Sequence, residues 1–152
     1  MASAFSPGIA AAAPSGGAEE SAARPAQINL RIVIAENDAI IAMDLAELLA
    51  DMGHEICAIA RSEAEAVIAA AQFAPDLMIV DGGLDSGSGV AAMRRILAER
   101  AVAHVYVTGS PQAVMAQAPG AIVVAKPFSL EDLRRGITAA CAAAGYQLRA
   151  IG

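Results

Sequence analysis

The sequence predicts an α/β domain, a doubly wound five-stranded parallel sheet with helices on both faces, and three observations predict it. From Arg31 onward, short apolar runs alternate with stretches in which apolar residues recur every three or four positions, as in a repeat of strands and helices. The apolar runs are continuous, which is typical of parallel strands buried on both faces. Because parallel strands need right-handed crossovers, a single open sheet in a three-layer sandwich is the simplest arrangement.

Composition divides the chain of 152 residues into three parts. Residues 1–28 are rich in Ala, Gly, Ser and Pro and show no apolar periodicity. Side chains this small bury too little surface to offset the entropy of ordering them, so we expect a disordered leader. Residues 29–144 carry the strand–helix repeat and are long enough for a sizeable core. Residues 145–152 are expected to form a C-terminal tail.

The expected strands are the five apolar runs, each bounded by polar residues, glycine or a proline-containing stretch. They cover residues 32–35, 55–59, 77–80, 104–108 and 121–125. Five helices follow them in turn. The first is expected to begin after Asp38 as N-cap and to end at Gly53. The second begins with a capping box of Ser62 and Glu65 and ends before Pro75.

The last three helices follow the third, fourth and fifth strands. The first of these is expected to bury Val90, Met93 and Leu97. Residues 111–117 are long enough for only about two turns, so we expect a short or mobile fourth helix. Ser129 is the expected N-cap of the last helix. The inner face of that helix is expected to be Leu130, Leu133 and Ile137.

Chemically useful side chains stand where four of the predicted strands end. Residues 36–38, Glu-Asn-Asp, follow the first strand, and Asp81 follows the third. Thr108 ends the fourth strand, and Lys126 follows the fifth. Ligands bind at the carboxyl ends of the strands in open α/β sheets. We therefore expect two acidic positions, a hydroxyl and an amine to lie around one site.

Charge and composition exclude several classes of function. The net charge is −6, from 16 acidic and 10 basic residues, which disfavours a nucleic-acid partner. No apolar stretch approaches the roughly 20 residues of a membrane span. Cys57 and Cys141 are expected to be reduced core thiols of a cytoplasmic protein. The glycines at 82–89 lack the lysine of a phosphate-binding P-loop and do not match a dinucleotide-binding pattern.

These residues resemble a response-regulator receiver domain over about residues 30–143. Asp81 lies 44 residues after Asn37, Gly89 follows Asp81 by eight, and residues 126–128 are Lys-Pro-Phe, all typical of that family. The resemblance implies a flavodoxin-like sandwich with strand order 2-1-3-4-5. No single element of the pattern is specific, but four elements in order at the matching strand ends are.

A narrower likeness is carried by residues 40–45, Ile-Ile-Ala-Met-Asp-Leu, and by residues 106–109, Tyr-Val-Thr-Gly. They are similar to PhyR-type receivers of the alphaproteobacterial general stress response and to related stand-alone receivers with a Phe-Ala-Thr-Gly stretch. A PhyR-type protein carries a sigma-factor-like domain before its receiver, where this chain has only the leader. The likeness thus implies a single-domain receiver without a DNA-binding or enzymatic output of its own.

The resemblance assigns a role to each residue at the strand ends. Asp81 would accept a phosphoryl group from a histidine kinase or phosphotransfer protein. Mg²⁺ would be held by Asn37, Asp81 and the backbone carbonyl of Gly83, with Glu36 acting through water. Such a protein is not a turnover enzyme, although it can lose its own phosphoryl group. It would signal to a downstream protein through the surface built from the fourth helix, fifth strand and fifth helix.

The phosphoryl group would be read by two further residues. Lys126 would pair with one phosphoryl oxygen, and Thr108 would donate its hydroxyl to another and so trigger the switch. Many receivers carry an aromatic switch residue where this chain has Val123. Tyr106, two residues before Thr108, is expected to take part of that role or else simply to pack in the core.

Two other classes of function remain open. The family usually has Asp where this chain has Asn37, so one negative charge is lost and Mg²⁺ binding should be weaker. The chain could therefore be a pseudo-receiver, an interaction module that is never phosphorylated. A phosphate-handling hydrolase with an aspartyl intermediate is the other alternative. Such enzymes usually carry a second Asp two residues after the nucleophile, where this chain has Gly83.

Overall fold

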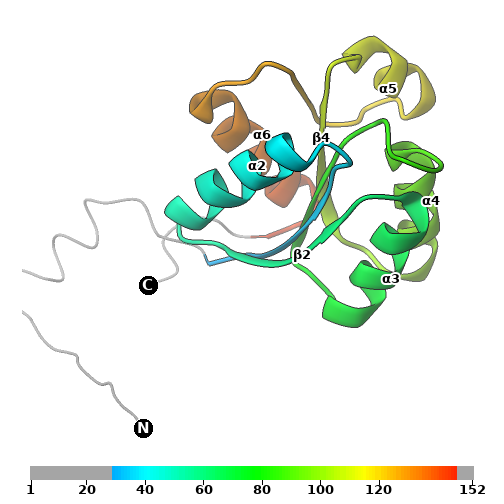
Figure 1. Cartoon of the computed structure of the whole chain (residues 1–152), viewed down its shortest axis with the longest axis horizontal. Coiled ribbons are helices and arrows are strands. Elements are labelled where there is room, and N and C mark those ends of the chain that lie inside the picture. Colours follow the sequence, from blue (N-terminus) through cyan, green and yellow to red (C-terminus); the bar gives the residue numbers. More distant parts are fainter. Residues whose placement is uncertain (1–28, 147–152) are drawn as a thin grey trace, which may run out of the picture. The chain divides into compact units, whose positions relative to one another are not determined.

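A computed structural model describes residues 29–146, which form alternating strands and helices (Figure 1). The expected disorder of residues 1–28 and most of the expected tail lie outside the described residues. The strands are β1 Arg31–Ala35, β2 Glu55–Ala60, β3 Leu77–Val80, β4 Ala103–Thr108 and β5 Val123–Ala125. The helices, labelled as in Figure 1, are α2 Ala39–Asp51, α3 Glu63–Phe73, α4 Gly89–Glu99, α5 Pro111–Gln117 and α6 Leu130–Ala143.

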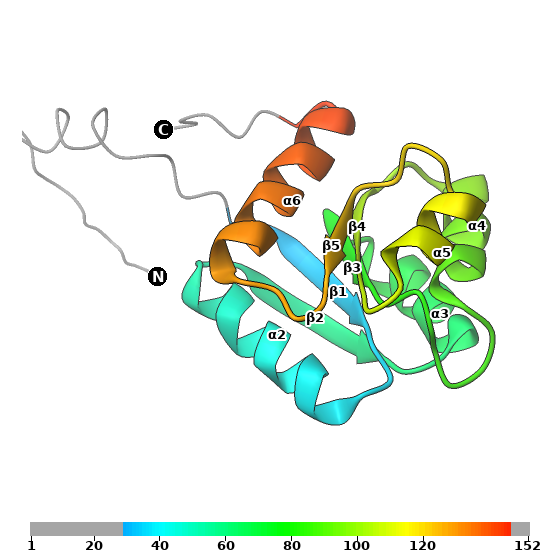
Figure 2. The same ribbon diagram turned by 90° about the horizontal axis from the view of Figure 1, so that it is seen from above.

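The five strands form one parallel sheet in the order β2-β1-β3-β4-β5, which confirms the predicted fold class. Figure 2 shows the two outer layers: α2 and α6 lie on one side of the sheet, and α3, α4 and α5 on the other. The change in direction of the strand order falls between β1 and β3. Their carboxyl ends therefore lie side by side at the point where such sheets bind ligands.

Both faces of the sheet are apolar because successive side chains of a strand point to opposite sides. Val33, Met78 and Tyr106 belong to the core cluster under α3, α4 and α5. Many of the helical residues in that cluster are alanines, so the helices approach the sheet closely. On the opposite face a Cβ added at Gly136 of α6 would lie 2.7 Å from Val124 Cγ2, which shows how tightly this helix packs.

The predicted helix starts are largely confirmed. The Asp38 carboxylate accepts from the backbone N–H groups of Ile40 and Ile41, and Ser129 forms a full capping box with Asp132. The capping box predicted for α3 is only half formed. Ser62 Oγ accepts from Glu65 N, but the Glu65 carboxylate accepts from the backbone N–H of Arg61, one residue before the N-cap.

Two predicted core positions are wrong. Leu97 and Leu130 are each 42% exposed, although both fit the helical spacing of their neighbours. In α4 the side chain that is buried in place of Leu97 is that of Ile96, which belongs to the core cluster. In α6 the buried face begins at Leu133, one turn after the N-terminus. The fifth strand is also shorter than predicted, because only residues 123–125 pair with β4.

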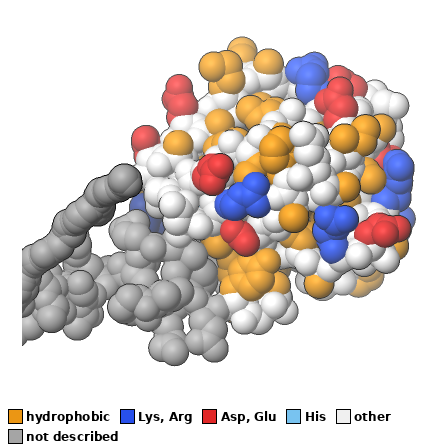
Figure 3. Space-filling model, turned by 90° about the horizontal axis from the view of Figure 1, so that it is seen from below, with side chains coloured by type: hydrophobic (Ala, Val, Ile, Leu, Met, Phe, Trp, Pro, Cys, Tyr) orange, Lys and Arg blue, Asp and Glu red, His pale blue; other side chains and the backbone are white. Residues whose placement is uncertain are grey.

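The two cysteines, the charges on the surface and the hydropathy of the helices were also predicted from the sequence. Cys57 and Cys141 are free thiols, in β2 and α6; Cys141 is buried as expected, whereas Cys57 is only partly buried. Acidic and basic side chains are interspersed on the face in Figure 3, with no continuous basic patch there. Within residues 29–146, no helix has the length and hydropathy that crossing a membrane requires.

Candidate functional site

The ammonium group of Lys126 joins the ends of three strands. Lys126 Nζ lies 3.0 Å from Glu36 Oε1 and 3.0 Å from Asp81 Oδ2. Glu36 follows β1, Asp81 follows β3 and Lys126 follows β5. Their backbones are fixed by the sheet, since the N–H groups of Glu36, Asp81 and Lys126 donate to carbonyls of neighbouring strands. The structure thus brings together three of the residues that the sequence placed at one site.

Glu36 is the most deeply buried charged residue described, with 1% of its surface exposed. Its second carboxylate oxygen, Oε2, accepts from the backbone N–H of Asp38. Burial raises the pKa of the Glu36 carboxyl, and the nearby carboxylate of Asp81 raises it further. The hydrogen bonds from Asp38 and Lys126 offset only part of this effect.

Lys126 shows the reverse balance. Burial acts to lower the pKa of its ammonium group, but the hydrogen bonds and charges of Asp81 and Glu36 outweigh burial and leave that pKa raised. Lys126 therefore stays charged at neutral pH. One positive charge faces two carboxylates, so this part of the site attracts a further cation.

Asp81 divides its two oxygens between different partners. Oδ2 pairs with Lys126, whereas Oδ1 accepts from the backbone N–H of Gly83 at 3.1 Å. Gly89 closes the same loop, because a Cβ at that position would overlap the backbone carbonyl oxygen of Asp81. A glycine eight residues after Asp81 is thus required by a close approach of two backbone segments.

Thr108 and Asp81 border one open pocket of about 430 Å³. Thr108 is 3% exposed, and its hydroxyl oxygen accepts from the backbone N–H of Ser110. The pocket is roofed by α5 through Ala113, Val114 and Gln117, and Lys126 lies at its border. A hydroxyl, a carboxylate and an ammonium group therefore line a space large enough for a phosphoryl group.

Tyr106 belongs to the core rather than to the rim of this pocket. It is 2% exposed, and its ring meets that of His104 edge to face with centroids 5.7 Å apart. Burial raises the pKa of its hydroxyl. Tyr106 pairs in register with Val123, so the aromatic residue and the position where receivers often carry one are neighbours across β4 and β5.

The oxygen atoms at this edge fit a hard divalent cation. Among residues 29–146, no three His, Cys, Asp or Glu side chains gather as a metal site. The available oxygen donors are the carboxylates of Glu36 and Asp81, the amide of the half-buried Asn37, and the backbone carbonyls of the loop that follows Asp81. Mg²⁺ prefers such oxygen ligands and keeps several waters, so a site with few protein ligands suits it.

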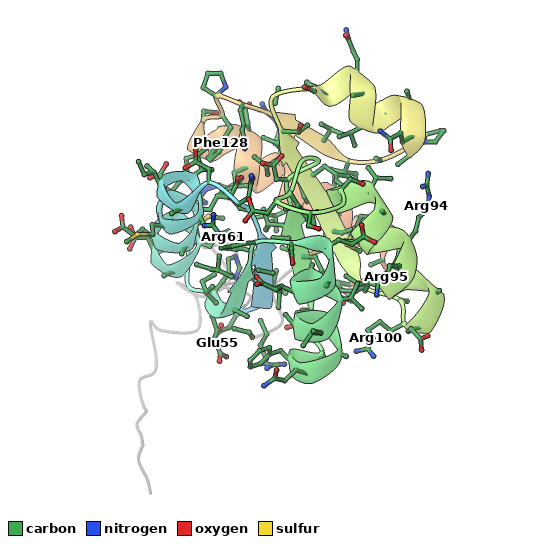
Figure 4. All side chains as sticks on the ribbon, turned by 45° about the vertical axis from the view of Figure 1, so that its right-hand side comes forward. Glu55, Arg61, Arg94, Arg95, Arg100 and Phe128 are labelled. Carbon is green, nitrogen blue, oxygen red and sulfur yellow. The ribbon has the colours of Figure 1, made fainter. Side chains whose placement is uncertain are left out.

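Two contacts around the site were missed at the sequence level. Glu63, in the first turn of α3, binds the loop that follows Asp81. Arg94 of α4 donates to the carbonyl of Gln117, the last residue of α5, at 2.9 Å (Figure 4). These partners are 25 and 23 residues apart in sequence. No local sequence pattern joins these partners. The sequence offers only weak signals for them: Glu63 stands next to a helix cap, and Arg94 stands next to a second arginine.

Comparison with known proteins places this geometry in a family. Residues 32–138 match the family described as the response regulator receiver domain. The transcriptional regulatory protein PdtaR of Mycobacterium tuberculosis is 38% identical over 112 residues, which cover 71% of this chain and 55% of PdtaR. The phyllosphere-induced regulator PhyR of Methylorubrum extorquens is 34% identical over 107 residues, or 68% of this chain and 40% of PhyR. The chain thus spans about half the length of these curated relatives.

Solved structures agree with the fold. The receiver domain of PhyR from Erythrobacter litoralis superimposes with a TM-score of 0.70 at 29% identity, covering 75% of this chain and 91% of that domain. PhyR from Brucella abortus gives a TM-score of 0.69 at 27% identity, covering 82% of this chain and 52% of that protein. The matching sequence, strand order and strand-end residues together show that the chain belongs to the response regulator receiver domain family.

Proposed function

We propose that the chain is a response regulator that accepts a phosphoryl group on Asp81 from a histidine kinase or a phosphotransfer protein. The transfer depends on Mg²⁺, takes place in the cytoplasm, and changes how the domain binds a downstream protein. The observation that carries the proposal is the position of Lys126, 3.0 Å from both Glu36 and Asp81. A phosphoacceptor carboxylate needs such a cation, because the incoming phosphoryl group is itself negatively charged.

The chemistry is a displacement at phosphorus. A carboxylate oxygen of Asp81 forms the new P–O bond, the P–N bond to the donor histidine breaks, and the histidine nitrogen keeps the electron pair and later takes up a proton. Bound Mg²⁺ would neutralise charge on the phosphoryl oxygens. Asn37, Asp81 and the Gly83 carbonyl would hold it, with Glu36 acting through water.

Lys126 and Thr108 would recognise the product. Lys126 is shared between two carboxylates and can pair with a phosphoryl oxygen as Asp81 loses its charge. The Thr108 hydroxyl accepts from Ser110 N, and it would donate its hydrogen to a second phosphoryl oxygen. Thr108 ends β4, and only two residues separate it from α5, so its movement would alter the surface formed by α5, β5 and α6. That surface is where we expect the downstream protein to bind.

Intact mass after incubation with a small phosphodonor tests the proposal. The wild-type protein should gain one phosphoryl group in the presence of Mg²⁺ and none in EDTA. Asp81→Asn should gain none in either condition. Since some receivers do not use small donors, a purified, autophosphorylated histidine kinase provides the second arm. A wild-type protein unmodified in both arms would contradict the proposal.

A pseudo-receiver is the second candidate, and Asn37 favours it. An amide at this position leaves one negative charge fewer for a divalent cation, while Lys126 already pairs with both carboxylates. Such a protein would bind its partner without modification. It is distinguished by a partner affinity that is the same for wild type and Asp81→Asn, with and without Mg²⁺.

A further inference from the structure

The loop that follows Asp81 is closed on itself by backbone contacts. We name residues 82–89 the acceptor loop. Gly89 N donates to Gly82 O at 2.9 Å, and Gly83 and Ser88 form an isolated antiparallel bridge. A Cβ at Gly83 would meet nothing within 4 Å, so no packing of its own holds this residue. Gly83 is therefore held by the backbone of the loop and by the hydrogen bond from its N–H to Asp81 Oδ1.

The acceptor loop is fastened at its far side to α3, and Glu63 makes the fastening. Glu63 N donates to Ser86 O at 3.0 Å, and Glu63 Oε1 accepts from Ser88 N at 3.3 Å. Gly87 has a φ of +82° and lies against the Glu63 side chain, where a Cβ would overlap the carboxylate. Three successive loop residues, 86–88, thus contact either the side chain or the backbone N–H of Glu63.

Neighbouring residues hold Glu63 and the loop in this arrangement. Arg95 of α4, visible in Figure 4, donates to Glu63 Oε2 at 3.2 Å, so both carboxylate oxygens are engaged. The Glu63 side chain is only 20% exposed. Arg61 adds a second tie, since its carbonyl accepts from Asp85 N and its guanidinium pairs with the Asp85 carboxylate at 3.2 Å.

We propose that Glu63 is a positioning residue for the divalent-cation site: it holds the acceptor loop so that Gly83, whose N–H donates to Asp81 Oδ1, stays beside Asp81 and its carbonyl can reach the cation. The inference rests on the proposed function, in which this carbonyl is a ligand. A cation that binds a loose loop must first order it, and that ordering reduces affinity. Glu63 removes this cost through the Ser88 hydrogen bond and the contact with Gly87. Groups that orient ligands without touching the metal commonly change its affinity.

Two substitutions separate the contact from the charge. Glu63→Ala removes the acceptor of the Ser88 N–H and the side chain that packs on Gly87. Glu63→Gln removes the same charge but keeps an oxygen that can accept from Ser88. Glu131→Ala, which removes an exposed first-turn acid from α6, controls for a general effect on helix stability. All three are compared with wild type by calorimetric titration with Mg²⁺ and by hydrogen exchange without Mg²⁺.

Glu63→Ala should raise the Kd for Mg²⁺ about tenfold, and the amides of Asp85 and Ser88 should exchange faster. The Kd of Glu63→Gln for Mg²⁺ should stay within about twofold of wild type, because the hydrogen bond from Ser88 is kept. The Kd of Glu131→Ala should stay within the same range, because that residue lies in α6 and not at the acceptor loop. Equal weakening by Ala and Gln would assign the effect to charge and overturn the inference. An unchanged Kd in Glu63→Ala, or no Mg²⁺ binding by wild type, would also overturn it. The proposed function is judged separately by the phosphoryl gain of the wild-type protein.

Discussion

Lys126 contributes to stability as well as to the proposed chemistry, because Glu36 is nearly inaccessible to water. Removing one member of a buried ion pair costs about 3–5 kcal/mol, since the other charge is left without compensation. A Lys126 variant with lost activity would therefore be ambiguous between loss of fold and loss of chemistry. Changes that keep the size and hydrogen bonds of a side chain and alter only its charge give clearer tests at this site.

Glu36→Gln should change how stability depends on pH. The pKa of Glu36 is raised on folding, so above the ordinary value of 4.5 the folded protein binds more protons than the unfolded chain. Its contribution is complete below that value and is lost as pH rises through the folded pKa. Glu36→Gln has no carboxyl at this position and does not lose stability in this way. Its free energy of unfolding should therefore increase relative to that of wild type as pH rises through this window. Urea unfolding in EDTA at a series of pH values measures the difference, and a difference independent of pH would refute the prediction.

Asn37→Asp should tighten Mg²⁺ binding by about tenfold, or about 1.4 kcal/mol, because it restores a negative charge among the oxygen ligands. The same charge should lower stability without metal, since it adds repulsion near Glu36 and Asp81. Asn37→Ala is the matched control and shows what the amide oxygen contributes. Calorimetric titration measures the affinities, and equal Mg²⁺ affinity in wild type and Asn37→Asp would show that residue 37 is not a ligand.

At the scale of elements, local chemistry was predictable and the choice of helix face was not. Asp38 and Ser129 cap their helices as predicted, because a cap depends only on residues within the next turn. Leu97 and Leu130 fit the helical period as well as the buried residues do, yet both are exposed. Which face is buried depends on how a helix rests on the sheet, and periodicity within one helix does not contain that information.

The candidate site shows the same division. Glu36, Asp81 and Lys126 were expected together because each ends a strand and parallel strands present their carboxyl ends at one edge. Glu63 was not expected, because its role arises only when α3 and the acceptor loop meet in three dimensions. The positions of residues at strand ends therefore predict the polar groups of a receiver site, but they do not predict the contacts that hold its loops.

Helix α5 is the least firmly attached element near the site. Val114 is its one buried residue, and Ser110 makes no side-chain cap bond. The Arg94 hydrogen bond to Gln117 O ties its last residue to α4. Amides of α5 should therefore exchange faster than those of α4, and Arg94→Ala should accelerate them further, by roughly fivefold if the bond contributes about 1 kcal/mol.

Hydrogen exchange of the unphosphorylated protein checks this prediction. Arg134→Ala, which changes an exposed arginine of α6, is the control and should leave α5 unchanged. Protection in α5 equal to that in α4 would contradict the expected mobility. An unchanged α5 in Arg94→Ala would show that the hydrogen bond does not restrain the helix.

For the whole molecule, the sheet order explains why the site exists only in the folded state. β1 and β3 are neighbours, which brings Glu36 and Asp81 together, but β4 separates β3 from β5. A long side chain at Lys126 is needed to reach across that strand to both carboxylates. Residues up to 90 positions apart thus form one cluster of two carboxylates and an ammonium group, which the unfolded chain does not have.

Mg²⁺ should therefore stabilise the whole domain. A ligand that binds only the folded state at 100 times its Kd adds about 2.7 kcal/mol to the free energy of unfolding. Urea unfolding with increasing MgCl₂, at ionic strength held constant with KCl, should show this rise, because constant ionic strength removes general screening. Asp81→Asn should show a smaller rise at the same Mg²⁺ concentration, since it loses a charged ligand. An equal rise in both proteins would place the cation elsewhere, and no rise in wild type would favour the pseudo-receiver, whose fold needs Lys126 alone to balance its buried carboxylates.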